Sequence, residues 1–210
     1  MRRSRLAAMP RSLTHTALAV AASLSITTYG AAAQTVDVQV QIAGADQAAP
    51  EGDRGGTTVY GFAEDGTLVT LRKGSNALIC LADDPSREGW STACYHTSLE
   101  PFMARGRELR AEGVTDGGEL ARRRYAEADA GTLAMPDKAA TLYVLTGDGF
   151  DAESGEVANG YVRYVVYTPW ATPESIGLSP QPAGPGAPWL MFPGTAGAHI
   201  MISPPGGEGD

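Results

Sequence analysis

The chain has 210 residues, of which 16 are lysine or arginine and 24 are aspartate or glutamate, so its formal net charge is −8. An acidic surface repels phosphate backbones and anionic lipid headgroups, and this argues against a protein that binds nucleic acids or membrane surfaces. Acidity otherwise favours solubility and does not identify a partner.

Residues 1–33 have the three parts of a secretory signal peptide. They contain four arginines and no acidic residue, and the apolar run Ala17–Ile26 and the small-residue pattern Ala31–Ala33 follow. A leader of this type is removed during export, so we expect a secreted or periplasmic protein without a membrane span after cleavage. Because the leader takes four of the 16 basic residues, 12 basic and 24 acidic residues remain, and the net charge becomes −12.

Cys80 and Cys94 predict a disulfide, since two cysteines in an exported chain are most simply a structural pair. The bridge would close a loop of roughly 15 residues and stabilise the fold by about 3 kcal/mol. It would also hold a strand at residues 90–96 beside a strand at residues 77–81. A redox-active or metal-binding pair would need closer spacing, such as C-x-x-C.

The segment that follows the leader predicts little regular structure. Val36, Val38, Val40 and Ile42 alternate with polar residues, which is the period of a single strand. A run rich in glycine, alanine and aspartate comes next, so we expect residues 34–56 to form a loosely ordered N-terminal arm.

The first well-marked unit is a three-stranded meander. Residues 57–63 and 67–72 are rich in β-branched and aromatic side chains, and they flank Asp65-Gly66, a strong hairpin signal. A second turn then returns the chain into the strand at residues 77–81. The three strands are therefore expected to pair in chain order.

Two helices are expected after these strands. Ser98 is a suitable N-cap for the first helix, which Gly113 would end. The second helix is expected over residues 117–130, opened by Asp116 with a glutamate three residues later.

The C-terminal half returns to strands. Residues 141–146 and 161–167 predict one long hairpin with an acidic loop. Short strands at residues 189–192 and 199–202 follow a proline- and glycine-rich run that no regular element accommodates.

The order of these elements indicates the fold class. About eight strands and two helices, with the helices grouped between runs of strands, favour an α+β fold with a mostly antiparallel sheet and helices on one face. We expect a single domain over residues 57–204 and a flexible tail at residues 205–210. The 177 residues that remain after cleavage of 33 from 210 suit one domain with a modest core.

Five runs of the sequence together resemble a family of uncharacterised exported bacterial proteins. The runs are KGSNALICLADDP, CYHTSLEPFMARGRELRAEG, MPDKAATLYVLTGDGFD, VRYVVYTPWATPESIGL and PWLMFPGTAGAHIMISP. The resemblance extends from Gly61 to Pro204, which is most of the mature chain. It implies export and a single compact domain, and it implies no activity.

His96 and His199 are the histidines outside the predicted leader, and with Glu100 they form a candidate metal site. Two histidines and one carboxylate can bind non-haem iron or zinc. However, the chain has no H-x-H or H-E-x-x-H motif. The favoured interpretation is two structural histidines that form hydrogen bonds at strand ends.

Two other kinds of site have weaker signals. Carboxylates crowd the loop from Asp148 to Glu156 and would suit calcium, but their spacing does not match an EF-hand loop and is typical of a solvated hairpin tip. Ser91, Ser98 and Ser203 lie near a histidine in the sequence, but none has the G-x-S-x-G surroundings of a hydrolase nucleophile.

Trp170 and Trp189 flank the proline-rich run and predict a shallow apolar ligand pocket beneath it. We therefore interpret the chain as an exported, disulfide-stapled domain that is a non-catalytic binding or structural protein. Its partner would be an unknown small molecule or a protein, and the sequence identifies no cofactor. The alternative is a metal-binding protein or metal-dependent enzyme that uses His96 and His199.

Overall fold

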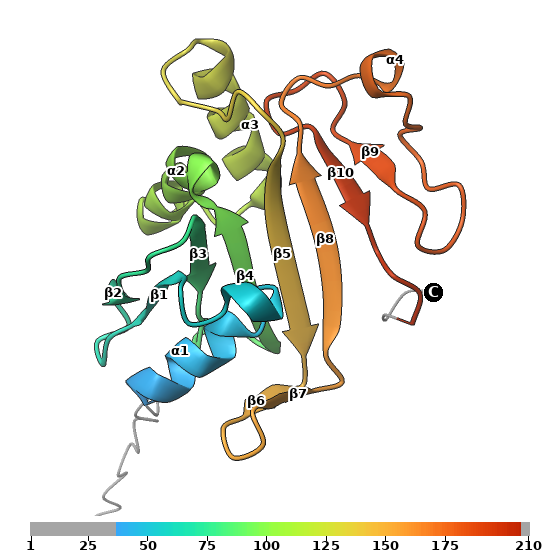
Figure 1. Cartoon of the computed structure of the whole chain (residues 1–210). Helices are drawn as coiled ribbons and strands as arrows, with labels where there is room; N and C mark the ends of the chain where they lie inside the picture. The colour runs from blue at the N-terminus through green and yellow to red at the C-terminus, as the bar shows by residue number, and fades with distance from the viewer. Residues whose placement is uncertain (1–36, 207–210) are drawn as a thin grey trace, which may run out of the picture. The chain divides into compact units, whose positions relative to one another are not determined.

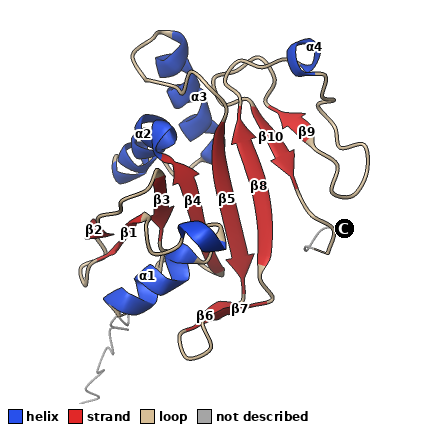
Figure 2. Ribbon diagram, viewed as in Figure 1, coloured by secondary structure: helices blue, strands red, loops and turns tan. Residues whose placement is uncertain are grey.

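The structure, a computed structural model, describes residues 37–206. The predicted signal peptide and the last four residues of the predicted tail lie outside the described residues. Eight strands form one sheet in the order β2-β1-β3-β4-β5-β8-β10-β9, and β6 and β7 form a separate hairpin (Figures 1 and 2). The strands are β1 (Thr58–Phe62), β2 (Leu68–Arg72), β3 (Leu78–Leu81), β4 (Trp90–His96), β5 (Ala140–Gly147), β6 (Gly149–Asp151), β7 (Glu156–Ala158), β8 (Tyr161–Tyr167), β9 (Trp189–Met191) and β10 (His199–Ile202).

Helices accompany a sheet that is antiparallel at every described pairing except that of β1 with β3. The α-helices are α1 (Val38–Asp46), α2 (Glu100–Ala111), α3 (Gly117–Asp129) and α4 (Pro173–Ile176). Short 3₁₀ turns are η1 (Glu51–Asp53) and η2 (Thr97–Leu99). This combination confirms the predicted α+β class with a mostly antiparallel sheet.

The segment with alternating valines is a helix, α1, so the strand predicted there is wrong. Asp37 caps the helix, since its side chain accepts a hydrogen bond of 2.7 Å from the backbone N–H of Gln39. The helix packs through its small residues, and Ala45 is 1% exposed. Burial of this small apolar face against the sheet outweighs the two-residue alternation, which is why the local pattern misleads.

Asp46 ties the end of α1 to the sheet. Its Oδ1 accepts hydrogen bonds of 2.7 Å each from the Arg72 guanidinium and the Thr57 hydroxyl. Its Oδ2 accepts a hydrogen bond of 3.2 Å from the backbone N–H of Gly55. A buried carboxylate needs such partners, and these partners fix α1 over β1 and β2.

The predicted meander is wrong at its third strand, because β3 pairs in parallel with β1 instead of following β2. The β1–β2 hairpin itself forms as predicted. After β2 the chain passes so close to the start of β1 that a Cβ on Gly74 would lie 2.3 Å from backbone atoms of Thr57 and Thr58. This crossing places the buried strand β3 inside the sheet and leaves the more exposed β2 at its edge.

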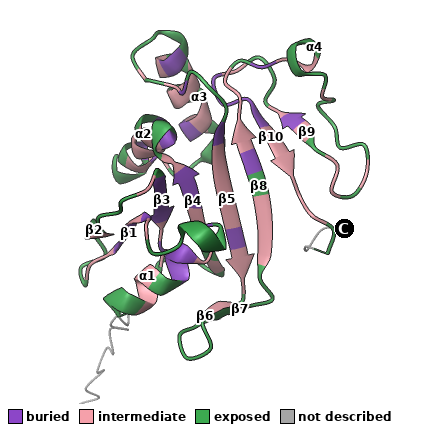
Figure 3. Cartoon of the chain, in the orientation of Figure 1, coloured by how far each residue is buried: buried purple, intermediate pink, exposed green. Residues whose placement is uncertain are grey.

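Apolar side chains form clusters on opposite faces of the sheet. Ala45, Ala48 and Ala49, from α1 and the turn after it, pack on a cluster that contains both cysteines and Leu145. On the other face, Leu99 and residues of α2 pack with Ile79, Tyr95 and Ala140. Figure 1 accordingly shows α1 in front of the sheet with α2 and α3 behind it, and Figure 3 shows the most buried strand residues in β3 and β4.

Strands β5 and β8 form the predicted long hairpin, and their pairing positions the candidate site. Ala140 at the start of β5 pairs with Tyr167 at the end of β8. Tyr167 also pairs with His199 at the start of β10. The loops before β5, after β8 and before β10 therefore meet at one end of the sheet. At the opposite end, the predicted acidic loop contains the small β6–β7 hairpin.

Candidate ligand-binding site

The predicted disulfide between Cys80 and Cys94 is present, and it joins directly opposed residues of β3 and β4. Both cysteines are fully buried in the cluster beneath α1. Residues 37–206 contain no free cysteine, so Cys94 cannot act as a thiol nucleophile beside His96.

The structure does not bring the candidate metal ligands together. His96 and His199 lie on β4 and β10, which β5 and β8 separate, and three strand spacings amount to about 14 Å. The Glu100 carboxylate instead accepts hydrogen bonds from the Tyr95 hydroxyl and the Arg107 guanidinium. Within the described residues, no group of three or more His, Cys, Asp or Glu side chains could hold a metal ion.

The other candidate groups make local structural contacts. Asp151 stabilises the β6–β7 turn by accepting hydrogen bonds from the backbone of Glu153 and the Ser154 hydroxyl. The exposed Ser98 hydroxyl lies 2.8 Å from His96 Nδ1. This Ser–His contact spans only two residues at the start of η2, and no carboxylate in the described part of the chain orients the imidazole as a catalytic triad requires.

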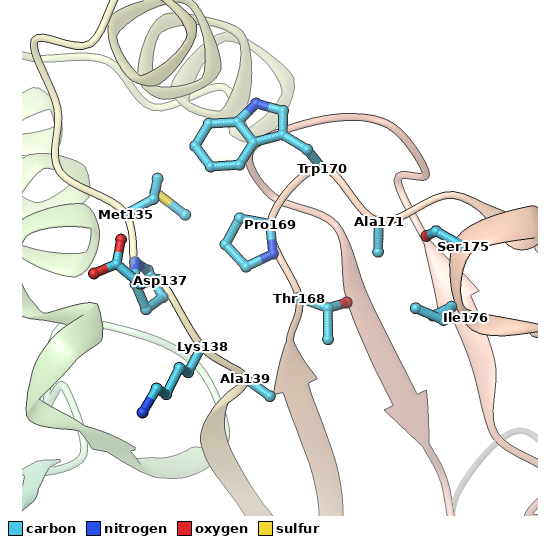
Figure 4. Close-up of a pocket in the computed structure, with 11 residues that line it drawn as sticks. Met135, Asp137, Lys138, Ala139, Thr168, Pro169, Trp170, Ala171, Ser175 and Ile176 are labelled. Atoms are coloured by element: carbon cyan, nitrogen blue, oxygen red, sulfur yellow. The ribbon is translucent and has the colours of Figure 1, made fainter.

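A surface pocket of about 630 Å³ opens where the start of β5, the end of β8 and α4 meet (Figure 4). Its volume falls within the range of about 300 to 1,000 Å³ that is usual for ligand sites. Three segments line it, namely residues 135–139 before β5, residues 168–171 after β8 and residues 175–176 of α4. We call this site the Trp170 pocket.

Trp170 is the one aromatic residue among those that line this pocket, and its conformation is unusual. The residue is 46% exposed and has a φ of 60°, in the left-handed region that bulky side chains avoid. Its backbone N–H donates to the carbonyl of Thr195 at 2.8 Å, and its indole Nε1 donates to Asp129 Oδ1 at 2.9 Å. These bonds hold the indole at the pocket, and Figure 4 shows it extending from its own segment towards the one that carries Met135.

Polar groups of several kinds surround the apolar part of the lining. Asp137 and Lys138 contribute opposite charges, and neither side chain has an ion pair or hydrogen bond within residues 37–206. The Ser175 hydroxyl bonds to the backbone of Thr172 and caps α4. The Thr168 hydroxyl oxygen is buried without a hydrogen-bond partner in the described part of the chain.

Aromatic rings cluster around His199 at the start of β10. His199 lies between Tyr167 and Phe192, with ring centroids 5.2 and 5.6 Å away. Burial lowers the pKa of His199, although its hydrogen bond to the Gly197 carbonyl opposes this effect. Burial raises the pKa of Tyr167 to about 12. Both groups are therefore neutral near pH 7 and serve as packing groups.

Only part of this site is predictable from local sequence patterns. Trp170 lines the pocket, whereas Trp189 lies on the edge strand β9 and is not among the lining residues. Residues 135–138 have no motif that would mark them as part of a site. The predicted pairing of residues 141–146 with 161–167 does indicate where the site lies, because it places the residues before the first strand beside those after the second.

None of the helices in residues 37–206 is both long enough and apolar enough to cross a membrane. Comparison of the chain with protein-family models, with curated proteins and with solved structures found no match.

Proposed function

We propose that this chain is an exported, disulfide-stapled, non-catalytic binding protein and that the Trp170 pocket holds its small-molecule ligand. The observation that carries the proposal is the exposed Trp170 ring, held at a pocket of about 630 Å³ in a strained backbone conformation. Strain of this kind costs about 1 to 3 kcal/mol and is concentrated at functional sites. A solvent-exposed indole contributes little to the core that would repay that cost.

The contacts of the candidate metal ligands support a binding role. His199 is 8% exposed, and Glu100 is held by Tyr95 and Arg107. The pocket itself contains no histidine or cysteine in its lining. Its polar groups are suited to hydrogen bonding with a ligand, which is the usual way that a mostly preformed pocket orients what it binds.

The disulfide supports export, because such bonds persist in oxidising compartments and are rare in reducing ones. The signal peptide, the secreted or periplasmic location and the relationship to exported bacterial proteins remain parts of the proposal. They can be checked by N-terminal sequencing of the protein recovered from the expressing cell's periplasm and medium.

A ligand screen tests the binding role. Amino acids, short peptides, fatty acids, nucleotides and sugars would be tested by thermal shift and then by calorimetry on the mature protein. We expect one of these classes to bind, and Trp170→Ala to weaken that binding by about tenfold, or about 1.4 kcal/mol. The matched control is Tyr164→Ala, which removes another exposed ring, 41% exposed, from the middle of the sheet. Failure of every class to bind, or equal binding by both variants, would contradict the proposal and favour a structural role.

A further inference from the structure

Two exposed aromatic residues share an unusual backbone conformation. Among the residues other than glycine in the described part of the chain, only Asn159, Trp170 and Phe192 have a positive φ. Asparagine often adopts this conformation, whereas it is unfavourable for bulky side chains. Trp170 and Phe192 are also 46% and 48% exposed, so neither ring is placed there mainly to fill the core.

The two residues flank one small region of the surface. Thr195 joins them, because its carbonyl accepts from the Trp170 backbone N–H at 2.8 Å and its hydroxyl donates to the Phe192 carbonyl at 2.8 Å. Both side chains also contact α3. The Trp170 indole bonds to Asp129, and the Phe192 ring centroid is 6.4 Å from that of Tyr125, one helical turn earlier. Thr195 therefore connects the backbones of the two residues, and both aromatic side chains contact the C-terminal part of α3.

The pocket beside this region combines an aromatic surface with donors and acceptors of both signs. Asp137 and Lys138 are exposed and have no ion pair or hydrogen bond within residues 37–206, so both are free to bond to a polar ligand, which an apolar ligand would not exploit. A charged ligand would be repelled by whichever of Asp137 and Lys138 carries a charge of the same sign. A strongly anionic ligand would in addition be repelled by the acidic chain, whose formal net charge is −8.

A neutral, polyhydroxylated ligand can bond to groups of both signs. Its hydroxyls both donate and accept hydrogen bonds, so they can pair with a carboxylate and an ammonium at the same site. Its axial C–H bonds form an apolar face that can lie on an indole, whose ring face carries negative charge. We infer that the ligand of the Trp170 pocket is an oligosaccharide, with one sugar ring on Trp170 and a further ring of the same chain on Phe192.

This inference rests on the proposed binding function and predicts a dependence on chain length. Cello-, malto- and chito-oligosaccharides, from the monosaccharide to the hexasaccharide, would be titrated into the mature protein by calorimetry. Trp170→Ala is expected to weaken binding at every length by about tenfold, or about 1.4 kcal/mol. Phe192→Ala is expected to leave the monosaccharide unaffected and to weaken the longer chains by a similar factor. Tyr164→Ala should change neither.

Two further variants distinguish a loss of binding from a loss of folding. Asp137→Asn and Lys138→Gln alter exposed side chains that have no described partner, so the fold should persist while sugar binding weakens severalfold. If a different ligand class binds through Trp170 and no sugar does, the saccharide inference is overturned and the proposed function stands. If sugars bind with equal affinity to the Trp170→Ala protein, both are overturned. If sugars bind and the effect of Phe192→Ala is the same at every length, the second subsite is excluded.

Discussion

Phe192 and Trp170 both have a backbone conformation that is unfavourable for residues with large side chains. Phe192 has a φ of 51° and Trp170 has a φ of 60°, and both values lie in the left-handed region. A left-handed conformation costs a residue with a Cβ about 1 to 2 kcal/mol. Glycine adopts it freely, and many turns of this chain use glycine in that way, as at Gly177 and Gly194. The aromatic residues therefore occupy positions where the backbone favours glycine.

This strain predicts an order of stability among variants of Phe192. Phe192→Ala and Phe192→Gly both remove the ring, but only the alanine variant retains the Cβ clash. Glycine also makes the unfolded chain more flexible, which offsets about 0.4 to 1 kcal/mol of the stability gained by removing the clash. We expect the glycine variant to be more stable than the alanine variant by up to about 1 kcal/mol, measured by urea denaturation. An alanine variant that equals or exceeds the glycine variant would show that the backbone here is not strained.

At the scale of elements, the path from β2 to β3 decides the sheet order. Gly74 lies against the backbone of Thr57 and Thr58, where an added Cβ would be 2.3 Å away. The backbone N–H groups of Ser75 and Asn76 donate to the Gly56 carbonyl next to this crossing. The crossing is what lets β3 reach the inner side of β1.

A substitution at this crossing should destabilise the fold. Gly74→Ala forces the two chain segments apart, and overpacking of this kind costs about 1 to 3 kcal/mol. Urea denaturation would measure the change in the free energy of unfolding. The matched control is Gly52→Ala in η1, where a Cβ would meet no atom within 4 Å. Equal stability of the two variants would mean that the chain tolerates a wider path at Gly74.

The disulfide covalently links β3 and β4 at directly opposed residues. Replacing both Cys80 and Cys94 with alanine is expected to cost about 2 to 5 kcal/mol of unfolding free energy. Dithiothreitol should lower the melting temperature of the wild-type protein and leave that of the double variant unchanged. A wild-type protein that melts at the same temperature with and without the reductant would contradict a stabilising role for this bond.

We expect the stability of the whole molecule to depend on pH through His199. Burial lowers the pKa of this imidazole in the folded state, whereas the unfolded chain has a histidine pKa of about 6.5. Between these two values the unfolded state binds a proton that the folded state does not, so the free energy of unfolding falls as the pH is lowered through this window. Below the folded-state pKa the contribution of this group changes no further.

Urea denaturation at intervals from pH 8 to pH 5 would test this dependence. The wild-type protein should lose stability as the pH falls below about 6.5. His199→Gln is expected to remove part of that slope. His96→Gln, which alters the other described histidine at a less buried position, is expected to retain it. An identical slope in all three proteins would exclude His199 as its source.

Local sequence patterns anticipated those features that depend on residues close together in the chain. The Asp65-Gly66 hairpin, the disulfide and the two helices near residues 100–111 and 117–129 follow from turn residues, spacing and, for the second helix, the Asp116 cap. The predicted Ser98 cap is wrong, because Leu99 precedes α2 without a side-chain cap bond and Ser98 lies in the short turn η2 that His96 caps. The pairing of β5 with β8 followed from two β-rich runs and a loop. Each of these signals is contained in a short stretch, so no knowledge of distant contacts was needed.

Features that depend on distant contacts were decided only by the tertiary structure. The valine alternation before Ala45 predicts a strand, yet burial of small residues on the disulfide-linked strands makes it a helix. The parallel pairing of β1 with β3 depends on the close crossing at Gly74. The Trp170 pocket exists because strand register brings residues 135–139 beside residues 168–171. Turn residues, helix spacing and the cysteine pair therefore specify the local elements and the covalent link, whereas the sheet order and the pocket depend on the packed chain, because burial and register arise only there.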